Sequence, residues 1–217
     1  MKKIFAFITM ALALASCGEF IEFNGESGDP VSITLARRNI DLMVGDRYEL
    51  PVSFQPADLA NKFVYWLSAN TEIVDFQNDT MRAVSPGSTY VTATAIAGNV
   101  TDTCRVTVHP LWQMSSAAYP YEMVIYARIT AAGHEFDDSI AVAAFVGDEL
   151  RGVAERKTWQ GTTYDLLRIG SPNAESESIT LRCYDRRRAL VTELKDFISF
   201  NGETNGTISH LVPVAFE

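Results

Sequence analysis

Short runs of alternating apolar and polar residues make up most of the chain after Pro30. Alternation with a period of two places side chains on opposite faces of a strand, so each run predicts a half-buried β-strand. Turn residues separate the runs, as at Gly45-Asp46 and Ser85-Pro86-Gly87. No stretch of the second half has the period and length of a long amphipathic helix. The pattern therefore predicts an all-β protein.

The first half predicts about seven short strands between residues 31 and 108, which is typical of two packed sheets of the immunoglobulin type. Trp66 lies on one of these strands and is expected in the core of the sandwich, although a tryptophan is also able to stack on a sugar. Cys104 has the same parity as Val106 and Val108, so it is expected to be a small core residue.

Several motifs of this region resemble the group-2 bacterial immunoglobulin-like domain, which occurs in surface adhesins and in many Bacteroidetes surface proteins. They are Ile33-Thr34-Leu35, Leu42-Met43-Val44-Gly45-Asp46, Val64-Tyr65-Trp66-Leu67-Ser68-Ala69-Asn70, Ser85-Pro86-Gly87-Ser88 and Cys104-Arg105-Val106-Thr107-Val108. The resemblance covers residues 31–108. It implies a spacer or adhesion module and brings no catalytic residues with it.

Residues 109–119 show neither the alternation of a strand nor the period of a helix. They are interpreted as a linker to a second domain, residues 120–217. That domain is expected to be a second β-sandwich, of jelly-roll or Ig-like type. Its run from Ile140 to Val146 is almost continuously apolar, which predicts a strand that is covered on both faces or lies in the middle of a sheet. The Tyr119-Pro120-Tyr121 opening and the following hairpin resemble a module of Bacteroidetes surface proteins, which implies a location and no defined activity.

The N-terminus has the features of a secretory signal. Lys2 and Lys3 precede an apolar run of 11 residues, Ile4 to Leu14, which is too short to span a membrane that requires ~20 helical residues. The run ends in Leu14-Ala15-Ser16-Cys17, which resembles a lipoprotein lipobox. Residues 1–16 are therefore interpreted as a signal peptide, Cys17 as the lipidated residue and residues 17–30 as a tether. The alternative is an ordinary signal peptide with a chance cysteine.

The acidic net charge of the chain limits the kinds of partner that it is expected to bind. The chain has 18 basic and 27 acidic residues, and loss of Lys2 and Lys3 leaves 16 basic residues and a net charge of −11. An acidic protein lacks the basic surface that nucleic acids require. We expect a protein held at the outer membrane by its lipid and displayed on the cell surface. Acidic residues after Cys17, which are spaced apart, resemble the surface-export signal of Bacteroidetes lipoproteins.

The sequence favours a protein that is not an enzyme and that has no cofactor and no metal ion. The histidines at 109, 134 and 210 have no spacing typical of a metal site. Asp137-Asp138 and Asp148-Glu149 are interpreted as turn acids; an envelope hydrolase using Asp137, Asp138 or His134 is the less favoured alternative. Arg186-Arg187-Arg188 is interpreted as a solvated hairpin turn, with an anionic polymer as its alternative ligand.

Carbohydrate binding is the most specific functional hypothesis, because aromatic rings stack on the apolar faces of pyranoses. The candidate rings are Trp159, Tyr164 and Trp112, with Asn173 and Arg168 as candidate hydrogen-bonding groups. The alternatives are that Trp159 covers its own hairpin and that Trp112 fills the domain junction. Cys183 is expected in a core, and a disulfide with Cys104 is not expected. The preferred function is adhesion or ligand binding, with a glycan or a surface protein as the partner.

Overall fold

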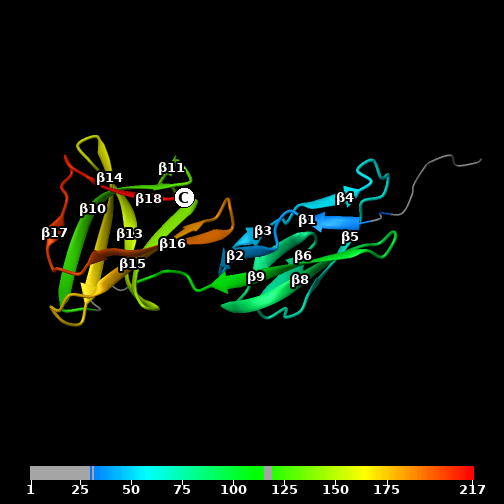
Figure 1. The fold of residues 1–217 in the computed structure, drawn as a ribbon, viewed down its shortest axis with the longest axis horizontal. Coiled ribbons are helices and arrows are strands. Elements are labelled where there is room, and N and C mark those ends of the chain that lie inside the picture. Colours follow the sequence, from blue (N-terminus) through cyan, green and yellow to red (C-terminus); the bar gives the residue numbers. More distant parts are fainter. Residues whose placement is uncertain (1–29, 31, 115–118) are drawn as a thin grey trace, which may run out of the picture.

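The computed structural model describes residues 30, 32–114 and 119–217. Two β lobes lie end to end in Figure 1: an N-terminal lobe of strands β1–β9 and a C-terminal lobe of strands β10–β18. The described residues form strands and turns without helices. The predicted all-β fold is confirmed. None of the described residues forms a helix long and apolar enough to cross a membrane.

The N-terminal lobe is a sandwich of short sheets. Its strands are β1 (Ser32–Leu35), β2 (Asn39–Met43), β3 (Arg47–Tyr48), β4 (Val52–Gln55), β5 (Val64–Ser68), β6 (Val74–Gln77), β7 (Thr80–Ala83), β8 (Gly87–Ala95) and β9 (Thr101–His109). The largest sheet has the order β2-β9-β8-β5, with β2 parallel to β9. The sheets β3-β7-β6 and β1-β4 complete the lobe.

The inward-facing positions of these strands form the first core, which includes Ile40, Leu42, Val74, Met81 and Val106. Trp66 was expected inside this core, and its position is different. The residue is only partly buried and packs against the core, where its ring stacks on Phe76 with 5.2 Å between centroids.

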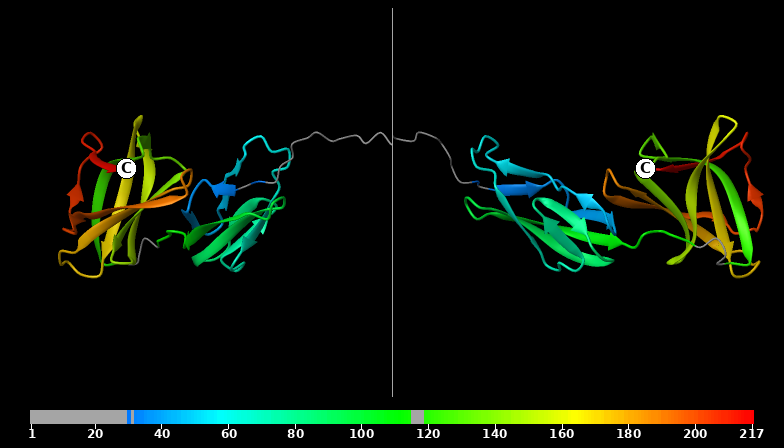
Figure 2. Two further views of the ribbon diagram at one scale, coloured as in Figure 1. Left: turned by 45° about the vertical axis from the view of Figure 1, so that its right-hand side comes forward. Right: turned by 180° about the vertical axis from the view of Figure 1, so that it is seen from behind.

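The C-terminal lobe is built on one curled sheet. Its strands are β10 (Tyr121–Ala131), β11 (His134–Glu135), β12 (Ile140–Val146), β13 (Glu149–Trp159), β14 (Thr162–Ser171), β15 (Ser178–Asp185), β16 (Leu190–Ser199), β17 (Thr204–Asn205) and β18 (Val212–Phe216). The main order is β11-β10-β14-β13-β12-β15-β16, and β17 and β18 pair in parallel with β10. The sheet curls round its own core, as the views in Figure 2 show.

Strand β13 carries the chain from one half of this sheet to the other. Its first half pairs with β12 and its second half, from Ala154, pairs with β14. Gly152 lies at the change of partner, where a Cβ atom would be 2.1 Å from the carbonyl oxygen of Arg168. Only glycine fits such a close backbone approach, so Gly152 allows β13 to pass this close to β14 where it changes partner.

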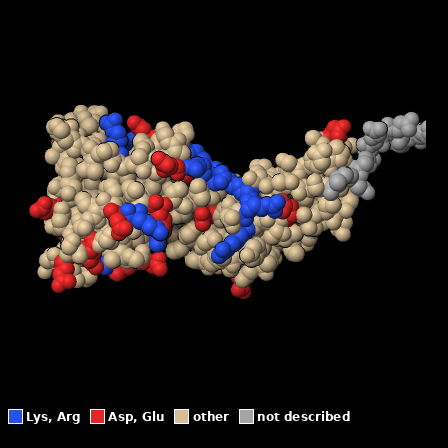
Figure 3. All heavy atoms as spheres, in the orientation of Figure 1, with Lys and Arg blue, Asp and Glu red and all other residues tan. Residues whose placement is uncertain are grey.

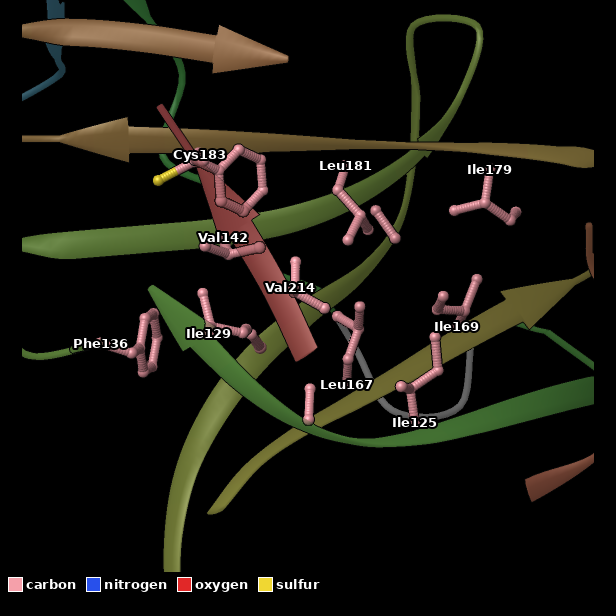
Figure 4. Packing of buried hydrophobic residues seen from close by; sticks show 14 of the residues in the cluster. Ile125, Ile129, Phe136, Val142, Leu167, Ile169, Ile179, Leu181, Cys183 and Val214 are labelled. Carbon is pink, nitrogen blue, oxygen red and sulfur yellow. The ribbon is translucent and has the colours of Figure 1, made fainter. Parts of the chain in front are cut away.

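Aliphatic side chains from most of the strands fill the second core, among them Ile125, Ile129, Leu167, Ile169 and Leu181 (Figure 4). The predicted cover on both faces of β12 is confirmed, since Val142, Ala143, Ala144 and Phe145 are all buried.

The two cysteines within the described residues lie in different cores. Cys104 belongs to the N-terminal core and Cys183 to the C-terminal core, and both are free thiols. Burial raises the pKa of the Cys104 thiol to about 11 and that of Cys183 to about 12. Both are small core residues, as the parity of their strands predicts.

The turn between β15 and β16 also contacts the N-terminal lobe, although Arg186 and Arg187 are exposed, as the interpretation of Arg186-Arg187-Arg188 as a solvated hairpin turn predicts. Buried Asp46 of the N-terminal lobe accepts hydrogen bonds from the Tyr184 hydroxyl at 2.5 Å and from the Arg186 Nε at 2.9 Å. Ala189 is fully buried against the N-terminal core. The sequence pattern missed this contact because the turn contains mainly charged residues.

Asp41 adds a second connection at the same junction. Its backbone N–H donates to the carbonyl oxygen of Ala189, and its carboxylate accepts from the Val191 N–H at 3.1 Å. The carboxylate also contacts the His109 Nε2 at 2.9 Å. Basic side chains gather where the lobes meet, as Figure 3 shows. The lobes are thus joined by hydrogen bonds in addition to the connecting chain.

The connecting chain packs on the C-terminal lobe at both of its ends. Trp112 meets Phe145 edge to face, with 5.7 Å between centroids. Tyr119 contacts three groups: its hydroxyl donates to Glu149 at 2.6 Å, the guanidinium of Arg151 lies over its ring, and a Cβ atom on Gly170 would collide with that ring. These contacts give the Tyr-Pro-Tyr opening a structural role.

Candidate functional site

Three neighbouring hollows surround the beginning of β14 in the C-terminal lobe. The largest, about 530 Å³, is lined by Trp159 and Tyr126 together with the segment from Thr204 to Ser209. A second of about 470 Å³ shares Ile208 and Ser209 with it. A third of about 320 Å³ lies beside Asp165, and Thr162 lines all three. The hollows therefore share walls.

The hairpin that joins β13 to β14 places Trp159 at the exposed end of β13. Gln160 and Gly161 form a two-residue turn in which both φ angles are positive, +47° and +81°. Turns of this kind match the twist of paired strands, so Trp159 lies opposite Thr162 at the end of a regular ladder. The indole is 59% exposed. It lines the largest hollow, and most of its surface is not covered by its own hairpin.

Hydroxyl groups also line the hollow of Trp159. They come from Thr162 on β14, Thr204 on β17, and Thr207 and Ser209 in the segment before β18. The Thr207 and Ser209 hydroxyls are 3.1 Å apart. An exposed indole next to hydroxyl donors and acceptors combines an apolar platform with hydrogen-bonding groups. Such a surface suits a ligand that has both an apolar face and polar edges.

Tyr164 belongs to the neighbouring polar hollow. Its ring packs on Tyr126, with 5.5 Å between centroids, and Tyr126 in turn lines the hollow of Trp159. Trp159 and Tyr164, both predicted as ligand-binding residues, are thereby brought to one region of the lobe.

Asp165 is the most unusual residue of this region. Strands β10 and β14 separate after the pair Ala127 and Asp165, and the Ile129 N–H, which lies beyond the last pair, donates to Asp165 Oδ2 at 2.8 Å. The residue is 2% exposed, and its Oδ1 has no hydrogen-bond partner among the described residues. Arg156 Nε lies 3.8 Å from Oδ1. Buried acceptors are normally satisfied, so this one is an exception.

The charges around Asp165 come from three strands. Arg156 of β13 also pairs with Glu135 of β11 at 3.2 Å, and Arg128 of β10 lines the same hollow. Burial raises the pKa of the Asp165 carboxyl; the bond from Ile129 and the two arginines oppose this effect, and Glu135 adds to it. Two guanidinium groups and two carboxyl groups therefore meet in one small space.

Other residues predicted from the sequence lie elsewhere. Trp112, the third candidate ring, packs edge to face on Phe145 at the start of the linker and is not among the residues that line the Trp159 hollow. Arg168 pairs with Glu122 at 2.7 Å, and Asn173 accepts from the Glu175 N–H in a loop. Cys17 lies outside the described residues. Sequence reasoning missed Tyr126, because only the pairing of β10 with β14 brings it to the Trp159 hollow, and it missed the burial of Asp165, which lies opposite Ala127 in the same pairing.

Asp137 and Asp148, both interpreted from the sequence as turn residues, take part in turns and ion pairs. Asp137 accepts from the Ser139 N–H at 2.9 Å and pairs with Arg187 at 3.4 Å. Asp148 pairs with Arg182 at 2.9 Å. Within the described ranges, no group of three or more His, Cys, Asp or Glu residues is placed to hold a metal ion.

Comparison with known proteins gives a family for the first lobe. A family model described as "Bacterial Ig-like domain (group 2)" matches residues 30–108, a little over a third of the 217 residues. Residues 30–108 form a bacterial Ig-like domain of group 2. The resemblance drawn from the sequence motifs is confirmed for this region. The Trp159 hollow lies outside the matched residues.

Solved structures resemble the chain only distantly. Domains 5–6 of the S-layer protein SbsC are 12% identical, with coverage of 82% of this chain and 100% of that one, at a TM-score of 0.30. Domains 4–9 of SbsC are 11% identical over 82% of this chain and 32% of that one, at 0.30. The Protocadherin GammaB4 extracellular domain is 11% identical over 83% and 32%, at 0.31. The chain spans about a third of the latter two. TM-scores of this size are too low for an inference about function. No curated protein matches the sequence.

The Ig-like domain has a hollow of its own, about 400 Å³, between β4 and β5. Trp66, Phe54 and Val64 contribute apolar walls to it. The outer side of β5 and β8 exposes large side chains: Tyr65 is 62% exposed and Tyr90 is 55% exposed. These residues are a second candidate surface, separate from the Trp159 hollow in sequence and in lobe.

Proposed function

We propose that the protein is a non-catalytic cell-envelope lipoprotein whose C-terminal lobe binds a glycan, with the Ig-like domain as its spacer. The exposed indole of Trp159 beside a wall of hydroxyl groups carries the proposal. Pyranose rings have an apolar face that stacks on an indole, and their hydroxyls exchange hydrogen bonds with threonine and serine. Both kinds of contact are available within one hollow.

The proposed anchor is the lipid on Cys17. Each buried methylene contributes ~0.8 kcal/mol to membrane binding, and stable anchoring takes two acyl chains, as a lipidated cysteine of this kind provides. The mature net charge of −11 repels anionic lipid, which favours a globular part held away from the bilayer. We place the protein at the outer membrane, facing outward.

The contact between the lobes supports the spacer role. Asp46 and Asp41 of the Ig-like domain bind the β15–β16 turn through side-chain and backbone hydrogen bonds. A spacer joined in this way sets the direction of the second lobe as well as its distance from the anchor.

Adhesion to a surface protein is the second candidate function. The exposed side chains of Phe63, Tyr65, Leu67 and Tyr90 on the Ig-like domain favour it, because exposed apolar groups of this size occur at protein interfaces. In this case the binding surface is on the first lobe, and Trp159 has no part in it.

A glycan array separates the two candidates. Residues 17–217 with Cys17→Ser form a soluble probe that keeps every other residue. We expect binding to one or more oligosaccharides, lost in Trp159→Ala and retained in the matched control Tyr65→Ala, an exposed aromatic of the other lobe. Absence of binding by the parent, or binding equal in Trp159→Ala, would contradict the glycan proposal. Lipid labelling of the full chain tests the anchor: it is expected to fail in Cys17→Ala, and equal labelling would exclude lipidation at that residue.

A further inference from the structure

The hollow of Trp159 and the neighbouring hollow of about 470 Å³ form one continuous surface. Their common walls are Thr162 of β14 and two residues of the segment between β17 and β18, Ile208 and Ser209. This segment lies along β10 in Figure 1, since the strands at both of its ends pair with β10. A ligand in the first hollow is therefore next to the second.

Strand β10 contributes one outward side chain to each of the two hollows. Ala127 and Ile129 are buried in the core, and side chains alternate along a strand, so Tyr126 and Arg128 point away from the core. Tyr126 lines the hollow of Trp159, and Arg128 lines the neighbouring hollow. The two residues are two positions apart, which is about 7 Å along a strand.

Strands β13 and β14 bring Trp159 to this same outer face. Trp159 lies opposite Thr162 in the ladder, and opposite residues of antiparallel strands share a face. Tyr164 has the parity of Thr162, and its ring packs on the ring of Tyr126 with 5.5 Å between centroids. Because this contact joins β14 to the outer side of β10, Trp159 and Arg128 lie on one side of the sheet.

Arg128 is the charged residue of this surface. It is exposed, and the other residues that line the two hollows are uncharged. Six other arginines of the lobe pair with carboxylates: Arg151, Arg156, Arg168, Arg182, Arg186 and Arg187. Among the residues that the structure describes, Arg128 has no such partner. Its guanidinium is therefore available to a ligand.

Arg128 also borders the hollow of Asp165, where the acidic groups have another partner. Glu135 pairs with Arg156 at 3.2 Å, and the Arg156 Nε lies 3.8 Å from the buried Asp165 carboxylate. Asp165 lies opposite Ala127, whose side chain is in the core, so Asp165 belongs to the inner face. These carboxylates are paired or buried on the far side of the sheet from the two outer hollows.

The chemistry of the outer surface favours an acidic sugar chain. A guanidinium forms two charge-assisted hydrogen bonds with a carboxylate and binds a sulfate group in the same way. The hydroxyls of Thr162 and Ser209, which both hollows share, donate to and accept from sugar hydroxyls. The mature net charge of −11 repels a densely charged polymer, so a chain with isolated acidic groups matches the protein best.

We infer that Arg128 forms an anion subsite beside the Trp159 platform and that the C-terminal lobe binds acidic oligosaccharides: one sugar ring stacks on Trp159, and a carboxylate or sulfate group of the same chain pairs with Arg128. This inference rests on the proposed glycan function and names its ligand class. Trp159 provides affinity for sugar chains in general, and Arg128 provides the preference for acidic ones.

The test uses residues 17–217 with Cys17→Ser as the parent, together with Trp159→Ala, Arg128→Gln and Lys195→Gln in the same background. Lys195 is a matched control, because it is a 76% exposed cation of the same lobe and lies on β16, outside the two hollows. The probes are glucose-, mannose- and galactose-based tetrasaccharides in three matched forms: neutral, with one uronic acid, and with one sulfate ester. Calorimetric titration measures each Kd, and urea unfolding verifies that each variant folds.

We expect the parent to bind a uronic-acid or sulfated chain at least tenfold more tightly than its neutral counterpart, as for hydrogen bonds to a charged group. Arg128→Gln is expected to reduce the affinity for the acidic chain to that for the neutral chain, and to leave the affinity for the neutral chain unchanged. Lys195→Gln is expected to change neither affinity, whereas Trp159→Ala is expected to weaken both. The tighter of the two acidic forms identifies the group that Arg128 selects.

Three results would overturn the inference. Equal affinity of the parent for neutral and acidic chains, with both lost in Trp159→Ala, overturns the anion subsite and leaves the proposed glycan function standing. A preference for acidic chains that persists in Arg128→Gln, or that is reduced equally in Lys195→Gln, overturns the role of Arg128. A parent that binds none of the probes overturns the subsite and the glycan function together.

Discussion

Removal of the Tyr184 hydroxyl tests the junction between the lobes. Tyr184→Phe keeps a fully buried ring in place and deletes one hydrogen bond, 2.5 Å long, to the Asp46 carboxylate. Hydrogen bonds to charged groups contribute about 1.5–3 kcal/mol. Asp46 keeps its bonds from the Met43 N–H and Arg186, so the acceptor stays partly satisfied. We expect the free energy of unfolding to fall by about 2 kcal/mol.

Urea denaturation at neutral pH measures this change. Tyr65→Phe is the matched control: Tyr65 is 62% exposed, and removal of an exposed hydroxyl changes stability by less than ~0.5 kcal/mol. A double-mutant cycle with Asp46→Asn then isolates the coupling between Tyr184 and Asp46, which are in contact and are expected to show about 1 kcal/mol or more of interaction energy.

The burial of Tyr184 gives an independent check. Burial raises the pKa of its phenol, and the bond to Asp46 raises it further. Its absorbance is therefore expected to titrate only on unfolding in alkali. A Tyr184→Phe variant as stable as Tyr65→Phe, with no coupling to Asp46, would refute the proposed contact between the lobes.

Thiol labelling and two substitutions, Gly152→Ala and Asp165→Asn, test the burial and packing of the strands. Cys104 and Cys183 are buried and their pKa values are raised, so a thiol reagent at pH 8 is expected to label them only after denaturation; rapid labelling of the folded protein would contradict their burial. Gly152→Ala is expected to cost several kcal/mol in unfolding experiments, because the new Cβ meets the Arg168 carbonyl, and a change under ~1 kcal/mol would show that β13 does not need the close approach. Asp165→Asn is expected to be at least as stable as the parent at pH 7 in urea denaturation: the folded-state pKa of Asp165 is raised, so its favourable contribution is present in acid and is lost as pH rises through that pKa. The advantage of the variant is expected to disappear in acid, and a variant less stable at pH 7 would contradict the account.

Much of the fold follows from local pattern. The alternation of Met123, Ile125, Ala127 and Ile129 predicts the buried face of β10, and the apolar run Ile140 to Val146 predicts a strand that is covered on both faces or lies in the middle of a sheet. Period-two patterning is a property of each strand alone, and it specifies which residues face a core. Motifs of the first half also predict its family.

Pairing between distant segments is not contained in that pattern. β10 pairs in parallel with β18, so that Ala127 lies beside Val212, and no local signal links the two. The same holds for Tyr184 and Asp46, which meet across the lobes. A charged turn is typical of a solvated surface, and here Arg186 and Arg187 are exposed, but the turn also contacts the other lobe because Asp46 provides a buried acceptor.

In the candidate site, too, one residue is visible in the local sequence pattern and another depends on the pairing of distant segments. Trp159 is identifiable from the sequence because it lies in a polar hairpin without apolar neighbours to bury it. Asp165 gave no such signal, since an aspartate in a strand is an ordinary surface residue until the structure shows it to be buried. Its significance depends on where β10 and β14 separate, which is a property of the tertiary fold.

Affinity electrophoresis through gels that contain polysaccharides shows whether binding resides in the C-terminal lobe. Trp159, Tyr65 and Tyr90 are similarly exposed aromatics, at 59%, 62% and 55%, and differ in their lobe. We expect a polysaccharide to retard the parent, Tyr65→Ala and Tyr90→Ala equally, and we expect Trp159→Ala to migrate freely. Free migration of Tyr65→Ala or Tyr90→Ala with retarded Trp159→Ala would place the binding surface on the Ig-like domain and contradict this expectation.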